Sequence, residues 1–290
     1  MQKQRSFAVI GGDRRIIELA NLLYADGNTV NVYGISAQKA LNAPCTAVLE
    51  EAVYGAELVI LPLPMLDKSG MINAPYAASS IYLTDVLKLM NNKQVLFAGN
   101  IPESAKKLCE IYGLYTNDYF KCEALTVTNA MLTAEGAIQT VLNAYPKALY
   151  ESRILIIGYG RIGKFLAKLL NGFGADVTVS GRRAETAAWV RAGGMKYIQI
   201  QDEFINPQAY DIVINTVPEP ILTQERIHSL KQDVLILDLA SGKGGTDFEY
   251  AKSRGIEAIH ALSLPGKTAP LAAGKAIKET IVRICDELGV

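Results

Sequence analysis

The sequence predicts an α/β protein of two domains joined by a long helix. Two observations lead to this fold class. Short runs of branched apolar residues alternate with stretches of helical periodicity along most of the 290 residues, as in parallel sheets covered by helices. Between two such regions, residues 126–150 keep a helical pattern with no turn cluster before Pro146. The predicted domains are residues 1–125, with a C-terminal helix at 268–290 that packs back on them, and residues 151–267.

The first domain is predicted to be a small parallel α/β domain. Its third strand ends at Pro62 and Pro64, which cannot continue a strand ladder and therefore indicate the carboxyl edge of the sheet, where ligands collect. Gly11 and Gly12 follow the first strand and precede a helix, so they form a corner that favours anions. The strands are expected at residues 6–10, 29–33, 57–62 and 94–99, with helices at 16–23 and 103–112.

The second domain contains six further strand-length runs. Six strands with helices between them fit a complete doubly wound Rossmann domain, which binds a dinucleotide at the carboxyl ends of its strands. The runs lie at residues 153–157, 176–180, 195–198, 210–215, 234–238 and 257–260.

A GxGxxG motif follows the first of these six strands and leads into a helix. Gly158 permits the tight turn, Gly160 lets the backbone approach a pyrophosphate, and Gly163 lets the helix lie close to the strand. The free N–H groups at the start of the helix then face the anion. The other interpretation is a tight strand-to-helix turn without a ligand. The motif predicts these cofactor-binding residues: Gly158, Tyr159, Gly160, Arg161, Ile162 and Gly163.

The end of the next strand indicates which dinucleotide binds. NAD sites place a carboxylate about 20 residues beyond the first glycine, where it holds the ribose 2′-hydroxyl. Here that position falls near Ser180 and Gly181, and two guanidinium groups, Arg182 and Arg183, lie where a 2′-phosphate would bind. NADP is therefore favoured, with NAD as the alternative if the arginines only begin a solvated helix. Residues at the ends of later strands complete the predicted cofactor set: Thr216, Val217, Pro218 and Ala240.

Composition narrows the functional class. Hydrophobic residues make up 50% of the chain and charged residues 20%, the profile of a soluble globular enzyme. The formal net charge is +0 with no basic tract, which argues against nucleic acid and anionic membranes as partners. No apolar run reaches about 18 residues and the first residues lead directly into a strand, so we expect neither a membrane span nor a signal peptide. The chain is expected in the cytoplasm, and the spacing of its cysteines predicts no metal site.

Four segments resemble the A subunit of dipicolinate synthase, the dehydrogenase-like subunit family of spore-forming bacteria. They are residues 8–13 (AVIGGD), 129–136 (NAMLTAEG), 158–163 (GYGRIG), and the stretch from 238–247 (DLASGKGGTD) to 264–270 (LPGKTAP). The resemblance implies oxidation of dihydrodipicolinate to dipicolinate (pyridine-2,6-dicarboxylate) with NAD(P) as hydride acceptor, during sporulation and in the mother cell. It also implies a flavoprotein-like B subunit as partner, and a homo-oligomer is expected.

Such a reaction needs groups that hold a flat dicarboxylate and accept a proton. Cations and hydroxyl or amide groups on loops near strand ends, or near the junction of the domains, meet that need. The candidate catalytic residues are Lys243, Glu135 and His260. The candidate substrate-binding residues are Arg14, Arg15, Asn129, Thr133, Ser241, Lys267 and Thr268. In the alternative interpretation, Lys243 is an exposed loop lysine and Glu135 a solvated helix carboxylate.

Two other functions fit the same two-domain pattern. One is an NAD(P)-dependent dehydrogenase of a hydroxy acid or an amino acid. The other is a sensor or scaffold that holds NADP without turning it over. A protein with either of these functions would not oxidise dihydrodipicolinate, so an assay of that reaction distinguishes both from the expected function.

Overall fold

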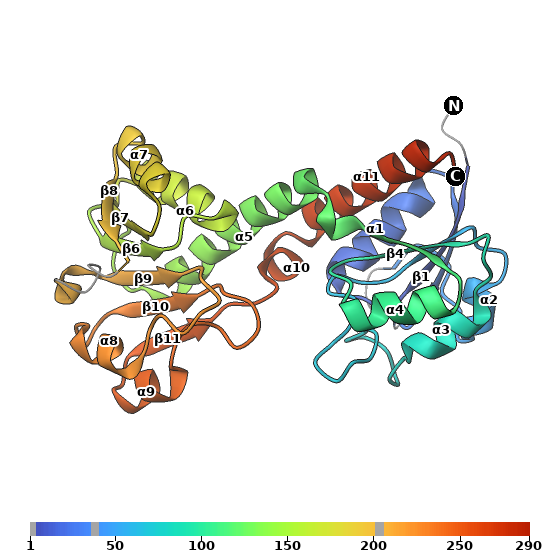
Figure 1. The fold of residues 1–290 in the computed structure, drawn as a ribbon, viewed down its shortest axis with the longest axis horizontal. Coiled ribbons are helices and arrows are strands. Elements are labelled where there is room, and N and C mark those ends of the chain that lie inside the picture. Colours follow the sequence, from blue (N-terminus) through green and yellow to red (C-terminus); the bar gives the residue numbers. More distant parts are fainter. Residues whose placement is uncertain (1–3, 36–40, 201–205) are drawn as a thin grey trace. The chain divides into compact units, whose positions relative to one another are not determined.

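The computed structural model describes residues 4–35, 41–200 and 206–290 (Figure 1). The chain divides into two compact units, and each contains its own parallel sheet. The first unit consists of Met1–Asn129 together with Pro265–Val290, and the second of Ala130–Leu264. The division at residue 129 falls inside the predicted linking helix 126–150. The predicted α/β fold class with two sheets is confirmed.

The first unit has a five-stranded sheet with the order β2-β1-β3-β4-β5, and every neighbouring pair is parallel. Its strands are β1 Ser6–Ile10, β2 Thr29–Tyr33, β3 Leu58–Ile60, β4 Val95–Ala98 and β5 Tyr115–Asp118. Its helices are α1 Arg14–Ala25, α2 Leu49–Val53, α3 Leu83–Leu89, α4 Glu103–Ile111 and α11 Pro270–Leu288, with the 3₁₀ turn η1 Tyr119–Lys121.

Alternate residues of β1 face two different cores. Phe7 and Val9 join the cluster that contains the buried faces of α1 and α11, while Ala8 and Ile10 join the cluster under α2, α3 and α4. Helix α11 packs against α1 so closely that a Cβ on Gly274 would lie 2.6 Å from the Arg15 carbonyl oxygen. The sheet is therefore covered by helices on both faces (Figure 1).

Strand β5 was not expected from the sequence. Its residues, Tyr115, Thr116, Asn117 and Asp118, are polar or aromatic and contain no apolar run, because β5 is an edge strand with no buried residue. Backbone pairing with β4 makes this segment a strand, although its composition does not predict one.

The second unit has a six-stranded parallel sheet with the order β11-β10-β9-β6-β7-β8. This is the strand order 6-5-4-1-2-3 of the dinucleotide-binding fold, so the predicted doubly wound Rossmann domain is confirmed. The strands are β6 Arg153–Ile157, β7 Asp176–Gly181, β8 Lys196–Gln199, β9 Ile212–Asn215, β10 Leu235–Asp238 and β11 Glu257–His260. The other elements are α6 Arg161–Gly172, α7 Ala184–Ala192, η2 Pro207–Ala209, α8 Gln224–Ser229 and α9 Phe248–Ser253.

Two helices cross the boundary between the units in sequence. Helix α5 covers Glu123–Ala144, and its residues Ala134, Ala137 and Val141 are fully buried in the core formed by one face of the second sheet. It ends before Pro146, because the residue that precedes a proline is disfavoured in helical conformation. Helix α10 covers Leu264–Thr268.

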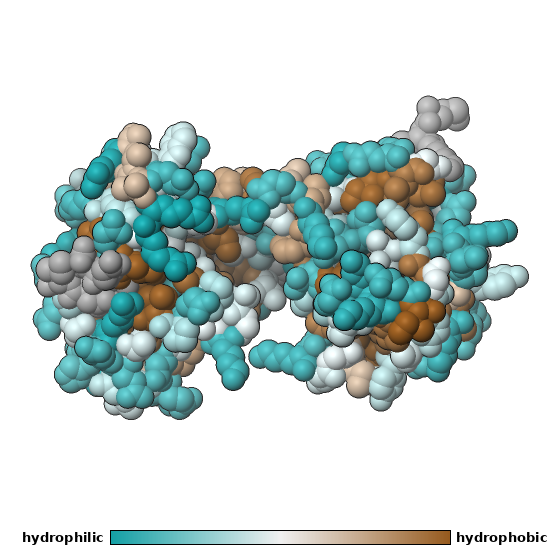
Figure 2. All heavy atoms as spheres, in the orientation of Figure 1, coloured by the Kyte–Doolittle hydropathy of each residue, from teal (hydrophilic) through white to brown (hydrophobic). Residues whose placement is uncertain are grey.

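Hydrophilic residues predominate on the face of each unit drawn in Figure 2, with smaller hydrophobic areas between them. Among the described residues, no helix combines the length and the apolar character needed to cross a membrane.

Candidate functional site

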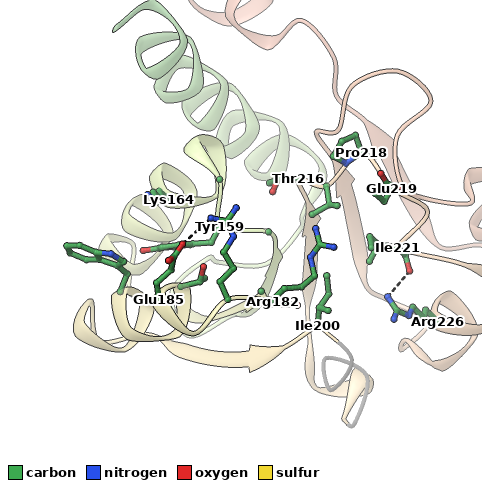
Figure 3. Close-up of a pocket in the computed structure, with 18 residues that line it drawn as sticks. Tyr159, Lys164, Arg182, Glu185, Ile200, Thr216, Pro218, Glu219, Ile221 and Arg226 are labelled. Atoms are coloured by element: carbon green, nitrogen blue, oxygen red, sulfur yellow. Dashed lines mark hydrogen bonds and ion pairs between the residues drawn. The ribbon is translucent and has the colours of Figure 1, made fainter. Parts of the chain in front are cut away.

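The second unit has a cleft at the carboxyl edge of its sheet (Figure 3). Residues that follow β6, β7 and β9 line a volume of about 620 Å³. In sequence order the chain builds β7 and β8 on one side of β6, and then β9 on the other. This reversal of direction is the place where doubly wound sheets bind their ligands.

The three glycines after β6 have different surroundings. Gly158 has φ +96°, and a Cβ there would lie 2.4 Å from the Thr216 hydroxyl oxygen. A Cβ on Gly163 would lie 2.3 Å from the Gly158 carbonyl oxygen, so only glycine lets α6 begin this close to the turn. Gly160 has no atom within 4 Å of its Cβ position, and it gives α6 no side-chain cap. The cleft is therefore open at Gly160, beside an uncapped helix N-terminus, as a bound pyrophosphate requires.

The wall after β7 carries two arginines with different partners. The Arg183 guanidinium is ion-paired with Glu185, with 3.0 Å between Nη1 and Oε1. Arg182 makes no hydrogen bond or ion pair with any residue that the structure describes. Ser180 is fully buried at the end of the strand. Lys164 also lines the cleft, and its ammonium lies 5.9 Å from the centre of the Tyr159 ring.

Burial raises the pKa of the Tyr159 phenol above its ordinary value, because burial disfavours the charged form. Tyr159 therefore lines the cleft with a neutral aromatic side chain.

A buried carboxylate organises the neighbouring loop. Asp238 ends β10 and is 0% exposed. It accepts hydrogen bonds from Gly245 N at 2.7 Å, Thr246 Oγ1 at 2.7 Å, Ala240 N at 2.9 Å and Asn215 Nδ2 at 3.2 Å. The glycine-rich loop 241–245 is consequently held at both of its ends. This role of Asp238 was not predicted from the sequence, although a polar residue ends each of two apolar strands, at Asn215 and Asp238.

The same loop is held against the end of β9. Ile221 N and Leu222 N both donate to the Gly245 carbonyl, at 3.0 and 2.9 Å. A Cβ on Gly245 would lie 2.3 Å from the Glu219 carbonyl oxygen, which explains the glycine at this position.

Ten of the predicted cofactor residues line the cleft and four do not. Arg161, Ile162, Gly163 and Ala240 are absent from its lining. The ten that line it are Gly158, Tyr159, Gly160, Ser180, Gly181, Arg182, Arg183, Thr216, Val217 and Pro218. Sequence reasoning missed eight further lining residues, most of them on helices or loops beyond the strand ends: Lys164, Glu185, Thr186, Trp189, Ile200, Glu219, Ile221 and Arg226. Of these, Glu185 carried a signal, since it stands two residues after Arg183 at a helix start.

The candidate catalytic residues of the second unit do not line this cleft. Lys243 and Ser241 are exposed on the loop held by Asp238, and Lys243 lines a separate groove with Thr223, Gln224 and Asp247. Glu135 is exposed on α5, and Thr133 is buried there at 9% exposure. Their roles at a substrate stay predictions.

His260 contacts Ala240, the residue before this loop, and does not line the cleft. Its Nε2 is 2.9 Å from the Ala240 carbonyl oxygen, and its ring stacks on Phe248 with 5.2 Å between centroids. Because a carbonyl oxygen only accepts hydrogen bonds, Nε2 is the nitrogen that carries a proton in this contact.

The other five candidate substrate-binding residues belong to the first unit: Arg14, Arg15, Asn129, Lys267 and Thr268. Arg15 is 5% exposed, and its guanidinium binds the Asp13 carboxylate at 2.8 Å and the Leu63 carbonyl oxygen. Arg14 is exposed. Asn129 lies in α5, and Lys267 and Thr268 are exposed in α10. Among the residues that the structure describes, Arg15 therefore has partners that Arg14 lacks, a difference that the sequence pattern did not show.

Comparison with known proteins covers both units. Residues 6–120 match the N-terminal domain of the dipicolinate synthase A subunit. The whole chain is 28% identical to the dipicolinate synthase A subunit of Bacillus subtilis (strain 168) over 292 residues, covering 97% of this chain and 96% of the relative. The resemblance to the A subunit of dipicolinate synthase is confirmed.

Two crystal structures of dipicolinate synthase A subunits have the same fold. The one from Bacillus halodurans has a TM-score of 0.87 at 25% identity, covering 98% of this chain and 99% of that chain. The one from Bacillus subtilis has a TM-score of 0.86 at 27% identity, covering 100% of this chain and 98% of that chain. The relatives are named as one subunit of their synthase, which implies a partner subunit for them.

The cleft lies in the part of the chain that matches a known cofactor-binding domain. Residues 126–244 match the NAD-binding domain of D-isomer specific 2-hydroxyacid dehydrogenases, and this range contains all the cleft residues. The second unit is therefore a nicotinamide-dinucleotide-binding domain, and the chain is of the oxidoreductase class.

Proposed function

We propose that this chain oxidises dihydrodipicolinate to dipicolinate with NADP as the hydride acceptor. The observation that carries the proposal is the resemblance to the dipicolinate synthase A subunit over nearly the whole length of both proteins. It covers the first unit, whose N-terminal domain type bears the name of that subunit, together with the more widely shared cofactor domain.

The main task of the protein in this reaction is to position the substrate next to the cofactor. The substrate loses a hydride from carbon and a proton, and the product ring becomes aromatic, so the stability of the product favours the reaction. The nicotinamide, when bound, supplies the hydride acceptor. The protein has to orient the two substrate carboxylates and give the proton a path to a base or to water.

We propose Lys243 as a carboxylate ligand and His260 as the proton acceptor. Lys243 is exposed on a loop whose ends are held by buried Asp238, so its cation stands on a fixed backbone. With Nε2 engaged by the Ala240 carbonyl, Nδ1 is the ring nitrogen of His260 that would accept a proton. Glu135, the third catalytic candidate, is exposed on α5 and is the alternative acceptor. Arg14 is the proposed carboxylate ligand of the first unit, because Arg15 is occupied by Asp13 and Leu63.

NADP as the acceptor is supported by Arg182. It lines the cleft after β7, makes no contact with a described carboxylate, and stands near the position where NAD sites carry an acidic residue. A guanidinium binds phosphate through two parallel N–H donors.

The direct test is dipicolinate formation followed by absorbance, with the full chain, dihydrodipicolinate, and NADP or NAD. The assay is run with and without the B subunit of the same organism, which tests the proposed partner at the same time. The variant Gly160→Val serves as the inactive control. Absence of turnover in both arms, with cofactor binding intact, would contradict the proposal and would favour a sensor or scaffold.

Lys243→Ala then tests the site. We expect a raised KM or a lowered kcat with cofactor affinity nearly unchanged, because the residue lies outside the cofactor cleft. Lys252→Ala, which removes an exposed lysine from α9, is the matched control. Equal kinetics in the two variants would remove Lys243 from the proposed site.

A second candidate function has one observation in its favour. The cofactor domain matches that of 2-hydroxyacid dehydrogenases, so oxidation of a 2-hydroxy acid is the alternative reaction. A panel of 2-hydroxy acids and amino acids, assayed with both cofactors, separates the two. Turnover of a panel member without turnover of dihydrodipicolinate would establish the alternative.

A further inference from the structure

Three arginines line the cofactor cleft, and they differ in their interactions within the chain. Arg183 is ion-paired with Glu185, and Arg226 donates to the Ile221 carbonyl oxygen at 3.1 Å. Arg182 has no hydrogen bond or ion pair within the described parts of the chain. All five N–H donors of its guanidinium are therefore available to a ligand.

The backbone that carries Arg182 is fixed by its surroundings. The carbonyl of Gly181, the residue before it, accepts hydrogen bonds from Tyr197 Oη at 2.8 Å and Ile200 N at 3.1 Å. Arg183, the residue after it, is the N-cap of α7. In Figure 3 the Arg182 side chain runs past Ile200 toward Thr216 and away from Glu185. A free cation on an anchored strand end can meet a phosphate without rearrangement of the backbone.

Charge separates Arg182 from Arg183. The Arg183–Glu185 pair has no net charge, whereas Arg182 carries a full positive charge that no described carboxylate balances. Transfer of Arg183 to a phosphate would leave the Glu185 carboxylate unpaired beside a dianion. One new attraction would then be offset by one new repulsion.

We propose that Arg182 alone selects the 2′-phosphate of NADP, and that Glu185 withdraws Arg183 from that phosphate. The inference rests on the proposed function only in taking NADP as the cofactor. It replaces a two-arginine phosphate site, which the sequence suggests, by a one-arginine site beside a neutral ion pair.

Three variants of the full chain test it by calorimetric titration with NADP and with NAD. Arg182→Ala lowers the affinity for NADP at least tenfold and changes the affinity for NAD less than twofold. Removal of the whole pair, Arg183→Ala with Glu185→Ala, leaves both affinities within about twofold, because the net charge is unchanged. Glu185→Gln frees Arg183 and raises the affinity for NADP several-fold. Lys168→Ala removes an exposed cation of α6 outside the cleft and controls for long-range charge.

Each contrary result has a defined meaning. If the paired deletion weakens NADP binding as much as Arg182→Ala does, Arg183 contacts the phosphate and the inference is overturned. If Glu185→Gln lowers the affinity for NAD without strengthening NADP, Glu185 holds the ribose hydroxyls and the inference is likewise overturned. If the unmodified protein binds NADP no more tightly than NAD, the choice of NADP as hydride acceptor in the proposed function is wrong. That result is independent of which arginine contacts the phosphate.

Discussion

The Thr246 hydroxyl donates to Asp238 Oδ2 at 2.7 Å, closing the loop 241–245 between them. The same carboxylate oxygen accepts from Gly245 N, and the other oxygen accepts from Ala240 N and Asn215 Nδ2. Four donors thus converge on one buried anion, which both shapes the loop that carries Lys243 and ties it to the end of β9.

Loss of this carboxylate is predicted to destabilise the second unit. Asp238→Ala leaves buried donors without an acceptor, and each hydrogen bond to a charged group contributes about 1.5–3 kcal/mol. We expect the free energy of unfolding to fall by at least about 3 kcal/mol, since the four losses are not additive. Urea unfolding measures it. Thr246→Val, which removes one donor of the four, should cost about 1.5 kcal/mol, the lower end of that range. Equal losses in the two variants would contradict the central role of Asp238.

Substitutions at the second and third glycines of the motif are predicted to have different effects. Gly160→Val adds a side chain where no protein atom lies within 4 Å, so the fold should survive while cofactor binding is lost. Gly163→Ala forces a Cβ to within 2.3 Å of the Gly158 carbonyl oxygen, and overpacking of this kind costs about 1–3 kcal/mol. Thermal unfolding and cofactor titration of both variants check the difference. Normal cofactor binding in Gly160→Val would exclude this turn as the pyrophosphate site.

The adjacent arginines of the first unit are predicted to separate stability from activity. Arg15→Met leaves Asp13 without its ion-pair partner at a site where Arg15 is 5% exposed, and breaking a buried pair costs about 3–5 kcal/mol. Asp13 is partly exposed, so the lower end of that range is expected. Arg14→Met should leave the free energy of unfolding within about 0.5 kcal/mol and reduce turnover instead. A large stability loss for Arg14→Met, or none for Arg15→Met, would reverse these assignments.

A pH-dependent contribution to stability is predicted at Asp211. Burial raises the pKa of its carboxyl, but hydrogen bonds from Lys231 Nζ at 2.5 Å and Arg153 N at 2.8 Å outweigh burial and hold the pKa below its ordinary value. The folded state therefore binds this proton less readily than the unfolded state, and the stabilisation is present above the ordinary pKa of aspartate. It is lost as the pH falls through the lowered pKa.

Asp211→Asn tests this linkage. The variant should be less stable than the unmodified protein at pH 7, and the difference in unfolding free energy should shrink as the pH falls below about 4. Denaturant titrations at several pH values measure the difference. A difference that stays constant down to about pH 3 would show that Asp211 does not titrate with a lowered pKa.

The sequence alone determined the sheet of the second unit. Each of its central strands is a run such as residues 154–157 in which all side chains are buried, and a run of that kind has few alternatives when glycines and helical periodicity follow it. The glycine turn was equally visible, because positive φ at Gly158 and the backbone contact at Gly163 restrict those positions to glycine wherever the turn occurs. Strand β5 was not predicted, because an edge strand with no buried residue does not need an apolar pattern.

Only the tertiary structure decided how neighbouring charges divide their roles. The sequence does not distinguish Arg14 from Arg15, or Arg182 from Arg183. In the structure Asp13 binds Arg15, and Glu185 binds Arg183. The convergence of Asn215, Gly245 and Thr246 on Asp238 likewise joins residues up to 23 positions apart. Electrostatic and hydrogen-bond partners are set by distances of a few ångströms in space, and strand register and loop closure, rather than sequence spacing, bring those groups together.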